Sequence, residues 1–165
     1  MSNKMWKALL GAGMLAIVTN TLAEVGTVSD ELAIKQRVHM LEMAFYPTQP
    51  DTVAKFYAKA VMDHNGALQY MVLSPDLRQS VQLFLQGKGW VTGIPGPKIV
   101  SYDVVNIARA AKLWTYAIHF NLERADGRSY SCVNHIEIGK VMNPEFGISP
   151  VWAITKLEFL APTEC

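Results

Sequence analysis

The chain has 165 residues, of which half are hydrophobic, 18% charged and 10% aromatic, and this composition excludes a disordered or low-complexity chain. The formal charge is +1, and setting aside the two lysines of the N-terminal segment leaves thirteen basic against fourteen acidic residues. Such a balance argues against a nucleic-acid or anionic-membrane binder, because those proteins need clustered Lys and Arg.

The first 23 residues have the layout of a secretory signal peptide. Two lysines precede an apolar run over residues 8–18, and a small-residue exit over residues 21–23 places cleavage before Glu24. An uncleaved anchor is the alternative, but it needs about 20 apolar residues, and Asn20 cuts this run short. We therefore expect an exported protein, periplasmic, cell-surface or secreted, whose residues 24–165 fold as one domain without a transmembrane span.

Helical signals dominate the first half of this domain. Thr27 or Ser29 can cap a helix that runs to about Phe45. Apolar spacing, a hydroxyl cap and helix-starting prolines predict further helices over residues 53–64, 67–73 and 75–86. Residues 87–97 hold four glycines and two prolines, so they form a loop, at whose centre Trp90 lies.

From residue 98 the apolar period changes to two, which predicts strands over residues 99–108, 113–124 and 151–160, with a further strand that ends near Val141. Asp126-Gly127 predicts a hairpin turn. A two-residue loop would pair Ile118 with His135. A three-residue loop with a glycine bulge keeps the apolar face intact, and we expect this second form. Its partners are Ile118 with Ile136, Tyr116 with Ile138, and Leu122 with Cys132.

Helices followed by a twisted antiparallel sheet predict an α+β domain with the helices packed on one face of a curved, cone-like sheet. Four motifs accompany this order: Pro50-Asp51-Thr52-Val53-Ala54-x-Phe56-Tyr57, Asn65-Gly66-Ala67-x-x-Tyr70, Leu73-Ser74-Pro75-x-Leu77-Arg78 and Gly89-Trp90-Val91-Thr92-Gly93. With these motifs the chain resembles the nuclear-transport-factor-two-like (cystatin-like α+β cone) superfamily, and more narrowly its uncharacterised exported bacterial members. The resemblance implies the fold, but this fold hosts both enzymes and non-catalytic binding modules.

One strand face carries two imidazoles and a carboxylate. In the expected register His119 lies opposite His135, and Glu137 lies opposite Ala117. Two imidazoles and a carboxylate form the ligand set of many zinc and non-haem iron sites. A flat sheet face supplies no enclosing further ligands, so we expect ordinary polar residues here, with no metal and no other cofactor.

Aromatic residues are the candidates for a ligand cavity between the helices and the sheet. They are Tyr57, Tyr70, Trp90, Trp114 and Tyr116, and plain core packing is the alternative for each. A proton-transfer enzyme would also need an acid or base in that cavity. Asp63 and Asp103 are the acids nearest to plausible positions, and neither has an identifiable partner in the sequence. We therefore predict no catalytic residue.

Cys132 and Cys165 are the two cysteines of the chain. Export permits a disulfide that fixes the C-terminal tail, and a buried thiol beside a free terminal one is the alternative. A metal site is disfavoured because neither cysteine belongs to a CxxC pair.

The function that follows is an exported, non-catalytic module that binds an envelope protein or a small apolar ligand. A homodimer through the open sheet face is a further expectation. That face is less polar than a fully solvated one, because it also carries Val133, Ala153, Thr155 and Leu157. The alternative is a small hydrolase or isomerase that uses the cavity.

Overall fold

The computed structural model describes residues 30–94, 96–142 and 149–162. The predicted signal peptide, its cleavage point and Cys165 lie outside these residues. The chain divides into two compact units, Met1–Ala44 and Phe45–Cys165, and each is considered by itself. Within the described ranges, no helix is both long and apolar enough to cross a membrane.

One helix covers residues 30–45, so the described residues of the first unit, 30–44, are all helical. The second unit contains three helices, α2 (Pro50–Met62), α3 (Gly66–Met71) and α4 (Pro75–Gly87). Proline occupies the first turn of both α2 and α4, and the Ser74 side chain accepts a hydrogen bond from the backbone N–H of Leu77 at the start of α4. The predicted start of α4 at residue 75 is confirmed, whereas α2 begins at Pro50, three residues before the predicted start at residue 53.

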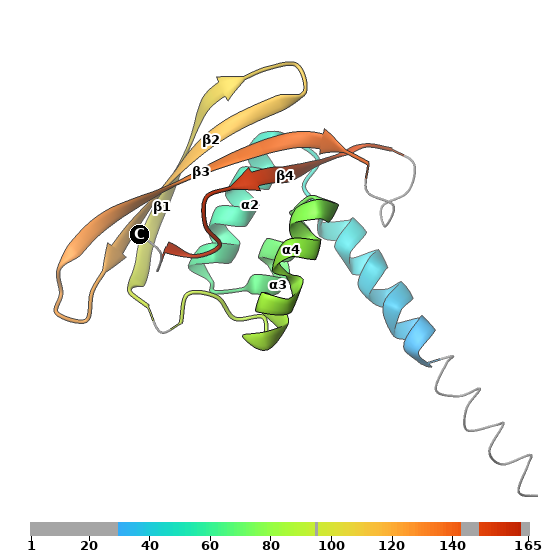
Figure 1. The fold of residues 1–165 in the computed structure, drawn as a ribbon, viewed down its shortest axis with the longest axis horizontal. Helices are drawn as coiled ribbons and strands as arrows, with labels where there is room; N and C mark the ends of the chain where they lie inside the picture. Colours follow the sequence, from blue (N-terminus) through green and yellow to red (C-terminus); the bar gives the residue numbers. More distant parts are fainter. Residues whose placement is uncertain (1–29, 95, 143–148, 163–165) are drawn as a thin grey trace, which may run out of the picture. The chain divides into compact units, whose positions relative to one another are not determined.

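Four strands follow in the order β1 (Lys98–Arg109), β2 (Leu113–Glu123), β3 (Ser129–Val141) and β4 (Val151–Leu157). They form one antiparallel sheet in which each strand pairs with the next along the chain. Helices α2, α3 and α4 lie on one side of this curved sheet (Figure 1). This confirms the predicted α+β arrangement.

The expected register between β2 and β3 is wrong by two residues. Ile118 lies opposite Asn134, Tyr116 opposite Ile136, and Phe120 opposite Cys132. The hairpin closes where the backbone N–H of Arg124 donates to the Arg128 carbonyl at 2.9 Å, so the three-residue loop is 125–127, one position earlier than the expected register requires. Because partners move by two residues, each side chain keeps its predicted face.

The core forms between α2 and the inner face of the sheet. Its fully buried members come from α2, the segment after α3, and alternate positions of β2, β3 and β4, and include Val53, Tyr57, Leu73, Tyr116, Ile118, Phe120, Leu122, Ile136, Ile138 and Ile154. Leu157 also packs against this core, which corrects its expected place on the open face. The cause is a β-bulge between Glu137 and Ile138 in the pairing of β3 with β4, which turns Leu157 inward opposite Ile136.

Candidate functional site

The outer face of the sheet is the surface that the helices of the second unit leave open (Figure 1). Val105 lies opposite Ala117, and Val133 lies one pair further along, opposite His119. Ala117 is 4% exposed and Val105 is 40% exposed. A patch of small apolar side chains therefore crosses three strands at the middle of this face, which we call the outer-face patch: Val105, Ala117 and Val133.

A polar ladder borders the outer-face patch on one side. The Asn121 amide nitrogen donates to the Ser101 hydroxyl at 2.9 Å, and the Ser131 hydroxyl donates to the Asn121 amide oxygen at 3.0 Å. These three side chains lie on β1, β2 and β3 and satisfy one another across the strands. Burying them against a partner therefore costs less than burying groups that still need water.

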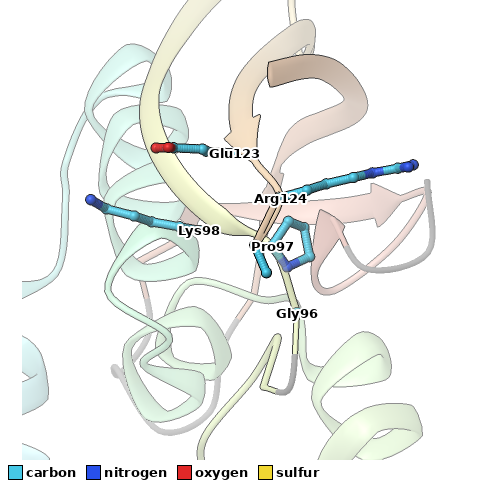
Figure 2. Close-up of a pocket in the computed structure, with 6 residues that line it drawn as sticks. Gly96, Pro97, Lys98, Glu123 and Arg124 are labelled. Atoms are coloured by element: carbon cyan, nitrogen blue, oxygen red, sulfur yellow. The ribbon is translucent and has the colours of Figure 1, made fainter. Parts of the chain in front are cut away.

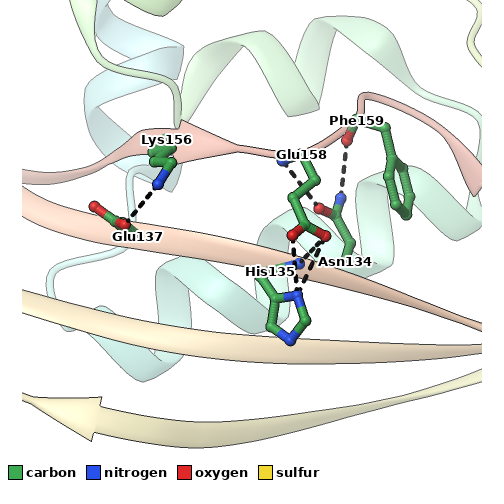
Figure 3. Close-up of polar contacts among 6 residues, drawn as sticks. All are labelled: Asn134, His135, Glu137, Lys156, Glu158 and Phe159. Atoms are coloured by element: carbon green, nitrogen blue, oxygen red, sulfur yellow. Dashed lines mark hydrogen bonds and ion pairs between the residues drawn. The ribbon is translucent and has the colours of Figure 1, made fainter.

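Two charge pairs border the patch on the side of β4, and Figure 3 shows both. The His135 ring nitrogen Nδ1 lies 3.1 Å from the Glu158 carboxylate, and the Lys156 ammonium donates to Glu137 at 3.2 Å. The pKa of Glu158 is lowered, chiefly because its carboxylate accepts the backbone N–H of His135, and the nearby imidazole adds to this effect. Carboxylates on this side of the face are thus already paired.

The structure separates the three candidate metal ligands. His119 lies opposite Val133, His135 opposite Ala117, and Glu137 opposite Thr115, so the two imidazoles are not directly paired as the expected register required. His135 and Glu137 are engaged with Glu158 and Lys156. Within the described residues, no three His, Cys, Asp or Glu side chains could hold a metal ion together.

The five aromatic candidates lie in three places. Tyr57 is fully buried in the core, and its hydroxyl donates to the Phe159 carbonyl at 3.1 Å. Tyr70 and Trp90 meet edge to face with ring centroids 5.4 Å apart. Trp114 and Tyr116, both on β2, stack with centroids 6.4 Å apart. Their contacts with one another therefore do not define a single shared cavity.

The polar partner of Tyr116 was missed in the sequence analysis. Its hydroxyl donates to the Asp51 carboxylate at 3.0 Å, at the first turn of α2. Burial raises the pKa of the Tyr116 phenol, and the hydrogen bond to Asp51 raises it further. The phenol is therefore a neutral donor. An aspartate in the first turn of a helix indicates capping, and this pattern does not predict that Asp51 also binds a tyrosine on β2.

Two of the sequence motifs form one structural unit, which we call the loop clasp: Asn65, Gly66, Gln69, Trp90 and Thr92. The Gly66 N–H donates to the Trp90 carbonyl at 2.8 Å, and the Gln69 amide nitrogen donates to the Thr92 hydroxyl at 2.6 Å. Asn65 forms an isolated antiparallel bridge with Val91 and caps α3. The motifs at 65–70 and 89–93 thus hold the glycine-rich loop against α3, which is a role in folding.

The two candidate acids are on the surface. Asp63 ends α2 and pairs with Lys59 of the same helix at 2.5 Å. Asp103 is exposed on the outer face, opposite His119. Neither carboxylate lies in the core between the helices and the sheet.

One surface pocket of about 370 Å³ lies where β1 begins and β2 ends, and Figure 2 shows its lining. The lining residues are Gly96, Pro97, Lys98, Glu123, Arg124 and Ala125. The Lys98 and Arg124 side chains extend in opposite directions, and the Arg124 guanidinium lies over the Tyr130 ring at 5.0 Å. The two cations therefore do not converge on a common ligand position.

Cys132 is buried on the inner face of β3. Its predicted disulfide partner, Cys165, lies outside the described residues, so the pairing stays a prediction. No family model and no curated protein matches this chain.

Proposed function

We propose that this chain is an exported, non-catalytic protein-interaction module of the bacterial cell envelope, with a nuclear-transport-factor-two-like fold, and that it binds a folded protein through the outer face of its sheet. The signal-peptide layout of residues 1–23 supports export. The α+β arrangement supports the fold family.

The observation that carries the proposal is the chemistry of the outer face. The outer-face patch supplies apolar area at the centre, and the Asn121 ladder and the two charge pairs at its borders are each bonded within themselves. A protein interface needs this combination, because an apolar centre contributes binding energy while unpaired buried polar groups oppose it. A homodimer through this face is one form that the interaction can take.

The ligand-cavity and enzyme alternatives receive less support. The five candidate aromatic residues lie apart, and the candidate acids lie on the surface. Within the described residues, Tyr116 and Asp51 form a part-buried polar pair of a phenol and a carboxylate. There the raised pKa keeps the phenol protonated, which suits a structural hydrogen bond and not a general base at neutral pH.

The test is site-specific photo-crosslinking in the exporting cell. A photoreactive side chain at Val105 or Val133, on the outer face, should give a discrete protein adduct. Leu83 on α4 is the matched control, because its apolar side chain is 82% exposed on a helix. Adducts of equal yield from Leu83, or no adduct from either outer-face position, would overturn the proposal. An adduct between two copies of the chain would identify the partner as a second copy.

A further inference from the structure

Asp103 is an acidic side chain beside the outer-face patch. It is exposed on β1, two residues before Val105 and on the same face of the sheet. Its partner across β2 is His119, which in turn lies opposite Val133. A carboxylate therefore shares the middle of the outer face with the three apolar side chains of the patch.

The other acids of the outer face each have a base beside them: Glu137 with Lys156, Glu158 with His135, and Glu123 with Lys98. The first two pairs are 3.2 and 3.1 Å apart, and the third is a directly opposite pair of β1 and β2. Several cations near the ends of the strands are engaged elsewhere. Arg109, Arg124 and Lys140 each lie over an aromatic ring, and Arg128 pairs with Asp126 at 2.9 Å.

Asp103 has no such base among the residues that the structure describes, and its side chain makes no hydrogen bond or ion pair there. Lys98 is five residues back along β1, about 16 Å for an extended strand, and Lys156 is three strands away, about 14 Å. Lys112 lies in the turn beyond the end of β1. The first two distances exceed the Debye length at physiological ionic strength, about 8 Å. The neutral imidazole of His119 can donate a hydrogen bond but contributes no charge.

A protein that binds over the outer-face patch takes water away from the Asp103 side chain. A carboxylate that loses its water without gaining a cation opposes association. A cation placed against it instead forms a charge-assisted hydrogen bond, which is stronger than a neutral one. A second copy of the chain fits this requirement poorly, because each lysine of its outer face already lies opposite a glutamate, and it brings a second unpaired Asp103.

We propose that the partner of the outer face is a different protein, whose binding surface has a small apolar centre and, beside it, an arginine or lysine that contacts the Asp103 carboxylate. This rests on the proposed function, since it needs the outer face to be the binding surface. The outer-face patch then supplies the apolar contact, and Asp103 selects a basic partner surface. Arginine fits best, because its planar guanidinium can bind both carboxylate oxygens at once.

The experiment measures the yield of the adduct from a photoreactive side chain at Val105 in the exporting cell. Asp103→Asn keeps the size of the side chain and removes its charge, so the sign of its effect is decisive. With a cation on the partner, the yield should fall about tenfold or more. Without one, the substitution removes the cost of burying a bare carboxylate, and an unchanged or higher yield would overturn the proposal. Glu123→Gln is the matched control at the far end of β2, and it should change the yield by less than about twofold.

Mass spectrometry of the Val105 adduct then identifies the partner and its attached residue, and charge exchange tests the contact. Changing the nearest Arg or Lys of the partner to Asp should abolish the adduct, and Asp103→Arg should restore it. A partner surface without Arg or Lys near the attached residue, an exchange that restores nothing, or an adduct between two copies of the chain would overturn this proposal and leave the proposed function standing. No adduct from Val105 or Val133 would refute both.

Discussion

Gly66→Ala is the substitution that tests the loop clasp most sharply. A Cβ atom at this position would lie 2.9 Å from the Trp90 carbonyl oxygen and 3.0 Å from Leu85 Cδ2. The Trp90 oxygen is also the acceptor of the Gly66 N–H, so relieving the clash strains or breaks that bond. The backbone oxygen cannot move aside as the end of a flexible side chain could.

The expected cost follows from these contacts. Overpacking of this kind costs about 1–3 kcal/mol, and the weakened hydrogen bond adds about 1 kcal/mol. The better helix propensity of alanine returns up to about 1 kcal/mol. We therefore expect a net loss of roughly 1–3 kcal/mol in the free energy of unfolding, which for a domain of this size lowers Tm by roughly 3 to 10 °C.

Urea unfolding followed by far-ultraviolet circular dichroism measures this loss, and Gly87→Ala provides the control. Gly87 is the last residue of α4, and a Cβ there meets nothing within 4 Å. Its substitution should change the free energy of unfolding by no more than about 0.5 kcal/mol in the destabilising direction. If Gly66→Ala proves as stable as Gly87→Ala, the clasp does not hold the loop as described.

Three further predictions concern other parts of the second unit. Burial raises the pKa of Tyr46 to about 12, so its contribution to stability is present below pH 10 and is lost as the pH rises from 10 to 12. Thermal unfolding should therefore show a Tm that depends less on pH in Tyr46→Phe than in the unmodified chain over that range. Equal pH dependence of Tm in the two proteins would contradict the raised pKa. Asn134 is fully buried and bridges β3 to the C-terminal segment through bonds of 2.8 and 3.3 Å; Asn134→Ala should cost about 1–3 kcal/mol in urea unfolding, and a cost near zero would show that the bridge is dispensable. If Cys132 pairs with Cys165, the bond should contribute about 3 to 4 kcal/mol, and two titratable thiols in the unreduced, denatured protein would show that it is absent.

The helices and the faces of the strands were predictable because both follow from local rules. Prolines and hydroxyl caps fix where helices start, and the period of two assigns each side chain of β2 to a face. The hairpin register was not predictable in the same way. Asp126-Gly127 fits a loop over 125–127 as well as one over 126–128, and the alternating pattern cannot distinguish registers that differ by two residues.

The sequence predicts which residues of β2 and β3 lie on the outer face, but not which side chains they bond to there. The outward positions of β2 and β3 identify the residues of the outer face, yet the partners of His135 and Glu137 come from the end of β4 and the residue after it. Leu157 shows the same limit, because one bulge in a strand reverses the face of every later residue. The hydrogen bond between Tyr116 and Asp51 joins residues 65 positions apart, and no local pattern encodes such a contact.

If the outer face of the sheet binds a protein, a second substitution on that face should change the yield of the photo-crosslinked adduct from Val105. Ala117→Arg places a long cation at the centre of the outer-face patch, whereas Leu83→Arg places the same cation on α4. We expect Ala117→Arg to abolish the adduct and Leu83→Arg to preserve it, with both variants folded by circular dichroism. An adduct that survives Ala117→Arg at full yield would contradict the claim.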